Sequence, residues 1–240
     1  MISDIWTVMW KERKGIFRLR GSRMRTVLSL FVPVIVIGIY LPWQRGSDWL
    51  DSPLSLISVL IPMTVVAMTV SDSFAGERER HTLGTLLASR LSDRAILFGK
   101  LALAVALGWG MTIATLIVGL VTVNVTQWNG GFLFYSPTMA LADLGLGLIA
   151  ATLVASAGVL ISLRSSTVQE AQQIIMVTML VPPLVLGVIA TLLHEQIARA
   201  LGSLSSMQVV LIIGAILAVA AVGLLLAAMT RFKRARLILD

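Results

Sequence analysis

The sequence predicts an all-α integral membrane protein, with six transmembrane helices, an N-terminal amphipathic helix and a short helix between the second and third spans. Hydrophobic residues make up 57% of its 240 residues, charged residues make up 13%, and the mean hydropathy is +0.92. Soluble domains are far less apolar and more charged. The apolar segments also lack the alternation of a lipid-facing β-barrel strand, so helices are expected to satisfy the backbone groups within the bilayer.

Six apolar segments are each long enough to cross roughly 30 Å of hydrocarbon as a helix. They cover approximately residues 26–43, 54–71, 101–123, 138–163, 171–193 and 207–229. No linker between them suggests a second domain. We therefore expect a single transmembrane domain that covers residues 1–240.

The distribution of basic residues predicts the orientation. Of the 19 Lys and Arg residues, all but Arg45 and Arg199 lie before the first span, after the last span, or in the second and fourth connections. The positive-inside rule therefore places both termini and the second connection in the cytoplasm, as an even number of spans also requires. The net charge of +7 follows from this topology and from attraction to anionic lipids, so nucleic acid is not an expected partner.

Residues 4–20 have the pattern of a helix that lies in the membrane interface. Their apolar residues recur at near-helical spacing, with Lys11, Lys14 and Arg18 alongside. The simplest role of this helix is to anchor the first span. The alternative is that its basic face contacts a cytoplasmic partner.

Three residues inside the predicted spans are candidates for a pathway or a hinge. Asp143 is an intramembrane carboxylate, which is costly, although it also fits a structural role as a hydrogen-bond acceptor or at the outer interface. Pro182 and Pro183 each remove a backbone donor and crowd the preceding turn, so a kink or local unwinding is expected there. This pair is either a bending point or an ordinary irregularity that neighbouring helices accommodate.

Small residues recur four positions apart in the third span, as Ala104 with Gly108 and as Ala106 with Gly110. Such spacing lets helix backbones approach closely. The pattern fits packing within the chain, and it also fits a dimer interface.

The most informative segment is the charge-dense connection at residues 72–100, DSFAGERERHTLGTLLASRLSDRAILFGK. Alternating charges at residues 77–80 follow Gly76, a natural end for the second span. A short helix is expected to begin near Thr82, and Ser92 with Asp93 forms a plausible N-cap for the third span. The short helix has a narrow apolar face made by three leucines, Leu83, Leu86 and Leu87. On this pattern alone the helix could also lie flat on the bilayer.

This connection resembles the segment that joins the second and third spans in the type-2 permeases of ATP-binding cassette (ABC) exporters. The resemblance rests on residues 74–79, on Thr82 and Leu83, on the Leu86–Leu87 pair and on residues 97–100, and the six spans extend it over the chain. In that family the segment is a coupling helix, seated in a groove of the nucleotide-binding subunit. The matching residues here are Glu77, Arg78, Glu79, Arg80, His81, Thr82, Leu83, Leu86 and Leu87.

The resemblance implies a permease subunit that exports or flips a substrate across the cytoplasmic membrane. It also implies two protein partners. One is a separate ABC ATPase, and the other is a second permease copy or a related chain in the lipid bilayer. The sequence has no G-x-x-x-x-G-K-[ST] phosphate loop, so ATP and Mg²⁺ are expected on the ATPase and no cofactor on this chain. His81 and Gly84 stand where relatives commonly have glycine and an acidic residue.

Three other functions are alternatives to a permease subunit. A membrane-embedded enzyme needs convergent catalytic groups, yet the two histidines, His81 and His194, fall on opposite sides of the predicted membrane. An ATP-independent, ion-driven transporter usually carries several intramembrane ionisable residues, and only Asp143 and the tandem proline suggest one here. A membrane receptor or scaffold remains an alternative, because the lack of chemical motifs is what such a protein shows.

Overall fold

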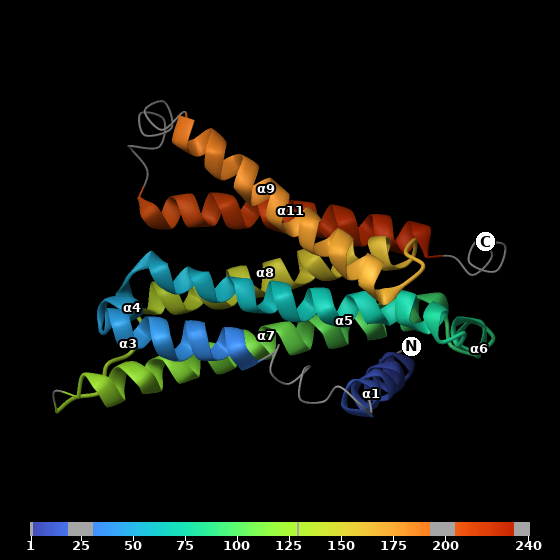
Figure 1. The fold of residues 1–240 in the computed structure, drawn as a ribbon, viewed down its shortest axis with the longest axis horizontal. Coiled ribbons are helices and arrows are strands. Elements are labelled where there is room, and N and C mark those ends of the chain that lie inside the picture. Colours follow the sequence, from blue (N-terminus) through green and yellow to red (C-terminus); the bar gives the residue numbers. More distant parts are fainter. Residues whose placement is uncertain (1, 19–30, 129, 193–204, 233–240) are drawn as a thin grey trace.

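A computed structural model describes residues 2–18, 31–128, 130–192 and 205–232 of the chain. Every regular element in these ranges is a helix, so the predicted all-α fold is confirmed (Figure 1). The elements are α1 (Ile2–Arg18), η1 (Val36–Tyr40), α3 (Leu41–Arg45), α4 (Asp48–Asp51), η2 (Pro53–Val59), α5 (Leu60–Glu79), α6 (Leu83–Leu87), α7 (Asp93–Thr126), α8 (Pro137–Ser162), α9 (Val168–Leu192) and α11 (Ser206–Arg231).

Four helical segments among the described residues are long and apolar enough to cross a membrane. They are Pro53–Glu79, Asp93–Thr126, Pro137–Ser162 and Met207–Arg231. The first predicted span is represented by a shorter apolar helix, Phe31–Arg45, and the fifth predicted span falls within α9. The predicted total of six spans therefore remains a prediction.

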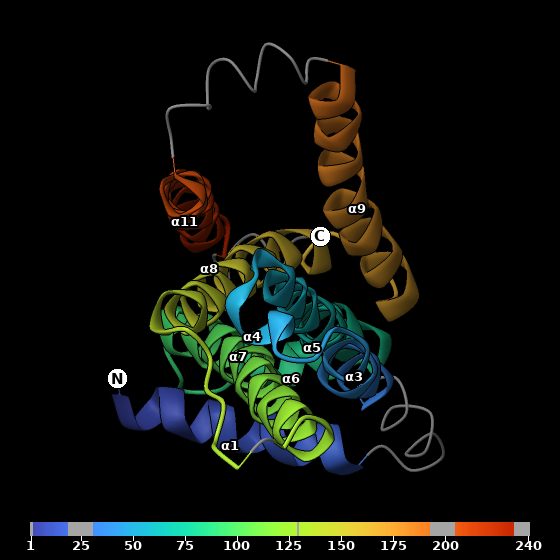
Figure 2. The ribbon, with the colours of Figure 1, turned by 90° about the vertical axis from the view of Figure 1, so that its left-hand side faces the viewer.

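α5, α7, α8 and α11 run side by side, α9 leans away from them, and α1 lies across one end of the bundle (Figures 1 and 2). α8 is central, because it packs against α5, α7, α9 and α11. The end that carries α1, α6 and the last turn of α11 is called the basic end below. Its exposed cations are Lys11, Arg13, Lys14, Arg80, Arg90, Arg94, Arg164 and Arg231. At the opposite end, Arg45 is exposed.

The connection between α5 and α7 forms the helices that the sequence predicts, except at its start. α5 continues to Glu79 and does not end near Gly76, because the side chains of residues 77–79 find partners within the bundle. The predicted short helix is α6, with Thr82 at its N-cap. The predicted N-cap of α7 is confirmed, since the Ser92 hydroxyl accepts a hydrogen bond from the Ala95 amide at 3.3 Å.

His81 explains the sharp turn at the end of α5. Its φ is +56°, and the Thr82 amide donates to the Glu77 carbonyl at 2.8 Å while the His81 amide donates to the Arg78 carbonyl at 3.0 Å. These two bonds define a Schellman motif, in which a left-handed residue ends a helix. Glycine adopts this conformation without strain, which gives a physical reason for the glycine common in the resembling family.

The tandem proline of α9 does not interrupt its helix. α9 is helical throughout Val168–Leu192, so the unwinding expected at Pro182 and Pro183 is absent and a hinge there remains a prediction. Irregular helix geometry is found instead near the opposite end, in the π-helical turn η1 and the 3₁₀ helix η2.

Gly108 and Gly110 show which small-residue stripe of α7 is used for packing within the chain. A Cβ atom on Gly108 would lie 2.6 Å from Val66 Cγ2 and 3.1 Å from the Pro62 carbonyl oxygen. A Cβ atom on Gly110 would meet nothing within 4 Å. The stripe with Gly108 therefore sets the close approach of α5 and α7.

Gly108→Ala should lower the free energy of unfolding by about 1–3 kcal/mol, because the added methyl group forces Val66 or the backbone of α5 to move. Gly110→Ala is the matched control and should keep stability or raise it by up to about 1 kcal/mol, because alanine has the higher helix propensity. Thermal unfolding of both purified variants in detergent measures the difference. Equal stability of the two variants would contradict the packing described here.

Candidate functional site

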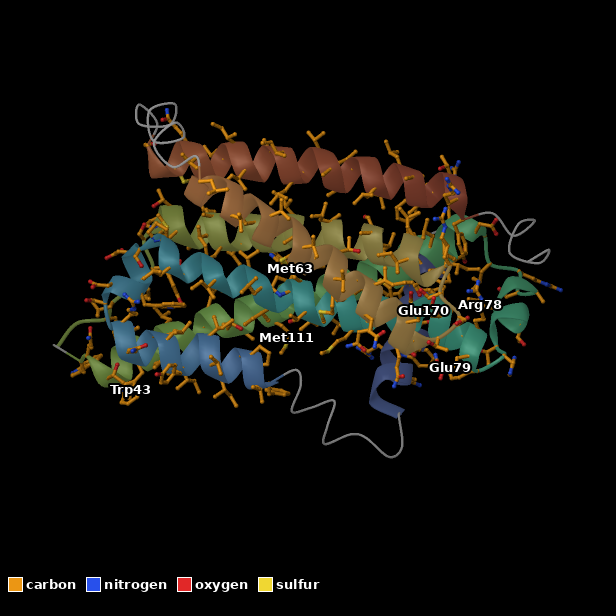
Figure 3. All side chains as sticks on the ribbon, turned by 45° about the horizontal axis from the view of Figure 1, so that its top comes forward. Trp43, Met63, Arg78, Glu79, Met111 and Glu170 are labelled. Carbon is orange, nitrogen blue, oxygen red and sulfur yellow. The ribbon has the colours of Figure 1, made fainter. Side chains whose placement is uncertain are left out.

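Three consecutive residues at the end of α5, Glu77, Arg78 and Glu79, each bind a different neighbouring part of the bundle. Successive helical residues are about 100° apart around the axis, so three of them reach out in three directions. Figure 3 shows Arg78 and Glu79, together with Glu170, at the basic end. Glu77, Arg78 and Glu79, together with Lys100 on α7, form the candidate site. This set of four residues is called the charged junction below.

Lys100 is the buried cation of the charged junction, with a side chain only 1% exposed. Its ammonium group donates to the Ser73 carbonyl at 2.6 Å, to Glu12 Oε1 at 2.9 Å and to Glu77 Oε1 at 3.1 Å. All three N–H donors of the ammonium are thereby satisfied. Lys11 of α1 adds a second cation 3.3 Å from Glu77 Oε1. The interaction ties α1, α5 and α7 together.

Gly99 lets α1 approach α7 beside this lysine. A Cβ atom at Gly99 would lie 2.6 Å from Val8 Cβ, and the Val8 side chain is buried. The interfacial helix is therefore held to α7 both by van der Waals contact and by ion pairs. This contact explains why α1 lies directly against the bundle and not apart from it.

Arg78 holds the end of α8. Its guanidinium donates to the Ser165 carbonyl at 2.6 Å and to the Leu163 carbonyl at 2.9 Å. These carbonyls follow the last turn of α8, where the helix dipole favours a cation. Ser162 strengthens the same contact, since its hydroxyl accepts from the Ala75 amide at 3.0 Å and donates to the Ser71 carbonyl at 3.2 Å.

Glu79 caps the start of α9. Its Oε2 accepts a hydrogen bond from the Val168 amide at 3.1 Å, which satisfies a donor that the helix leaves unpaired. Glu170, two residues further along α9, accepts from the hydroxyl and the amide of Ser166, and these bonds lower the pKa of the Glu170 carboxyl. Two carboxylates thus stand at the positive end of the α9 dipole.

The residues that follow turn towards the surface. Arg80 pairs with Asp72 at 2.9 Å, and this hydrogen bond raises the pKa of the Arg80 guanidinium. His81, Thr82, Gly84 and Thr85 are exposed. Leu86 is buried in the hydrophobic core, so it anchors α6 to the chain's own bundle. The side chains of Leu83 and Leu87 lie outside the described residues.

Asp143 lies far from the charged junction, inside the bundle near the opposite end. Its Oδ1 accepts from the Ser58 hydroxyl at 2.8 Å, and its side chain is fully buried. No described residue donates to its Oδ2. Nearby, burial raises the pKa of Tyr135 to about 12, so that phenol stays neutral. Asp143 therefore joins α8 to η2, and its role in a pathway remains a prediction.

Sequence reasoning missed Lys100, Glu12 and Ser162, although a signal existed for the lysine. Lys100 stands between the apolar stretches Ala95–Phe98 and Leu101–Leu107, so a charge there needs a partner inside the protein. Nothing in the sequence indicates which carboxylates supply it. The described residues contain no group of three His, Cys, Asp or Glu side chains that could hold a metal ion.

A comparison with known protein families agrees with this architecture, in which a short helix stands between two long apolar helices. A family profile described as ABC-2 family transporter protein matches residues 44–201, which is more than half of the chain. The chain therefore belongs to the ABC-2 transporter family, a family of membrane permeases, and the resemblance seen in the sequence is confirmed. No curated protein and no solved structure matches the chain significantly.

Lys100→Met should lower the free energy of unfolding by about 3–5 kcal/mol, because Glu77 and Glu12 lose the buried cation that compensates them. Arg80→Gln breaks the exposed pair with Asp72 and is the matched control, with an expected cost of about 0–1 kcal/mol. Thermal unfolding in detergent compares the two. Similar losses in both variants would show that Lys100 is not the central cation.

Asp143→Asn should keep stability within about 1 kcal/mol, because its amide oxygen still accepts from Ser58. Asp143→Ala should cost about 1–3 kcal/mol, since the buried Ser58 hydroxyl loses its acceptor. Thermal unfolding tests both variants, and a transport assay in vesicles separates the two roles. A stable Asn variant that does not transport would contradict the structural role.

Proposed function

We propose that this chain is the transport subunit of an ABC exporter of the cytoplasmic membrane, driven by ATP that a separate ATPase subunit hydrolyses. Membership of the ABC-2 family supports the permease part of this proposal. The single observation that carries the coupling part is α6, a short helix with exposed residues that lies between two long helices in the chain. The excess of exposed cations at the same end supports a cytoplasmic position for α6.

The charged junction supports a mechanism for this coupling. A partner that moves α6 also moves the end of α5, because the Schellman motif and buried Leu86 join them. Glu77, Arg78 and Glu79 then pull on α1 and α7, on the end of α8 and on the start of α9. A partner shifts the membrane helices only if it binds two conformations of this unit with different free energies.

The proposed docking surface consists of the exposed residues around α6. It does not consist of Glu77, Arg78 and Glu79, which bind neighbouring parts of the chain. Thr82, Gly84 and Thr85 are exposed, whereas Glu77 is 5% exposed and is used within the chain. Alanine substitutions at Glu77 or Arg78 would therefore disturb the fold together with any partner. An exposed residue without intramolecular contacts gives a cleaner test.

A second permease copy completes the proposed exporter, with the substrate pathway between the two copies. The support for this part is family membership alone. Within the described residues, Asp143 and the tandem proline of α9 remain proposed pathway or hinge residues. The exported substrate is not assigned.

Gly84→Lys should reduce binding of the ATPase by about 30-fold, as expected for a substitution that costs about 2 kcal/mol at the centre of an interface. A Cβ atom at Gly84 would meet nothing within 4 Å and the position is exposed, so the permease should fold normally. Gly131→Lys is the matched control at the opposite end, where a side chain also meets nothing within 4 Å. Copurification and stimulated ATP hydrolysis measure the effect. Unchanged coupling in a folded Gly84→Lys variant would remove α6 from the mechanism.

A further inference from the structure

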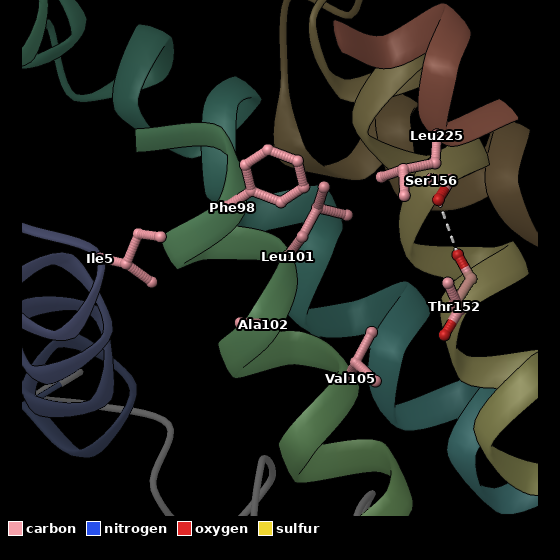
Figure 4. A pocket seen from close by; sticks show the side chains of 8 residues that line it. All are labelled: Ile5, Phe98, Leu101, Ala102, Val105, Thr152, Ser156 and Leu225. Carbon is pink, nitrogen blue, oxygen red and sulfur yellow. Dashed lines mark hydrogen bonds between the residues drawn. The ribbon is translucent and has the colours of Figure 1, made fainter. Parts of the chain in front are cut away.

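A groove with a volume of about 370 Å³ opens beside α7 in the half of the bundle near the basic end. Four helices supply its lining, with α7 as the floor and with α1, α8 and α11 around it (Figure 4). The lining residues are Ile5, Phe98, Leu101, Ala102, Val105, Thr152, Ser156 and Leu225. None of them belongs to the charged junction.

The walls of the groove offer an occupant no free hydrogen-bond donor. Thr152 and Ser156 are the polar residues of the lining, and both hydroxyls are used within α8. The Thr152 hydroxyl donates to the Leu148 carbonyl at 2.8 Å, and the Ser156 hydroxyl donates to the Thr152 carbonyl at 2.8 Å (Figure 4). Water in such a groove would lose hydrogen bonds without replacement, so the groove favours an apolar occupant.

The shape of the floor suits an extended chain that runs along the membrane normal. Phe98, Leu101, Ala102 and Val105 are spaced as i, i+3, i+4 and i+7, which places them on one face of α7. This face extends over about 10 Å of helix. α1 lies across the bundle at the start of that face (Figure 1), so the groove begins at the depth of the interfacial helix.

A cation continues the same face beyond the apolar floor. Arg94 precedes Phe98 by one turn of α7 and is exposed. An arginine guanidinium matches the geometry of a phosphate group and binds it by two hydrogen bonds. Glu12, an acidic residue of α1, is paired with Lys100 and does not neutralise Arg94.

We propose that this groove binds an acyl chain of an anionic phospholipid from the leaflet at the basic end, with Arg94 on the headgroup phosphate. The apolar walls select the chain, and the exposed arginine at the mouth selects the negative headgroup. The bound lipid fills the space between α1 and the long helices. It thereby contacts α1 at Ile5, about two turns before Glu12, the residue of α1 that pairs with Lys100. This inference does not depend on the exported substrate or on the ATPase.

The full-length chain in vesicles of phosphatidylethanolamine and phosphatidylglycerol provides the test. Phosphatidylglycerol with a photoactivatable diazirine in its acyl chain should label peptides that contain residues 98–105. Ala102→Phe fills the groove and should lower this labelling about tenfold, the change that 1.4 kcal/mol of binding brings. Ala106→Phe is the matched control, since Ala106 is exposed on the same helix outside the groove, and it should keep the labelling.

The headgroup preference is tested separately. Arg94→Gln should remove the preference for labelled phosphatidylglycerol over labelled phosphatidylcholine, and Arg90→Gln, at another exposed arginine, should keep it. This readout does not require the Phe variant to fold, and Ala102→Leu gives a smaller filling residue. Equal labelling in the Ala102 and Ala106 variants, or no headgroup preference in the natural chain, would overturn the proposal.

Because the chain has no cysteine, Val105→Cys adds one further check. Disulfide-linked dimers of this variant would show that a second copy occupies the groove, and would also overturn the proposal.

Discussion

The buried pair of Lys100 and Glu77 constrains the architecture of the basic end. An ammonium group removed from water is unfavourable unless carboxylates and carbonyls surround it. Here Glu77, Glu12 and the Ser73 carbonyl provide that environment, and they come from two helices other than α7. The position of α1 across the bundle and the extension of α5 beyond Gly76 both follow from this requirement. Glu77, Arg78 and Glu79 therefore form bonds within the chain, whether or not a partner is bound.

The same arrangement joins five helices to the end of a single one. Glu77 contacts α1 and α7, Arg78 contacts the end of α8, Glu79 contacts the start of α9, and the Schellman motif leads into α6. Charge-assisted hydrogen bonds are the strong and directional ones, so this junction resists deformation more than surface pairs do. Such a junction is consistent with the proposed transmission of force from α6 to the spans.

Much of the fold was predictable because its local rules are strong. The apolar composition predicted helices, and a serine before an aspartate predicted the start of α7, where the Ser92 cap is found. The candidate segment at residues 77–87 was predicted from its resemblance to the coupling segment of the family. Its division into three residues bonded within the chain and an exposed short helix was not predicted. That division depends on Lys100 and Leu163, which are distant in sequence, and a local pattern carries no information on such pairings. The left-handed His81 was also missed, because glycine is the residue that usually marks this turn.

The two ends of the bundle differ in the kind of interaction that holds them, and this difference indicates where shape change is absorbed. At the basic end, charged side chains fix the helix ends through short hydrogen bonds. At the opposite end, η1 is a π-helical turn and η2 is a 3₁₀ helix, and a neutral hydroxyl on η2 bonds to Asp143. A 3₁₀ helix has poorer hydrogen-bond geometry than an α-helix and often marks a hinge, and π-helical turns are frequent at functional sites. If α6 couples to a partner as proposed, we expect its motion to be transmitted through the charged junction and to deform the helices where their backbone is already irregular.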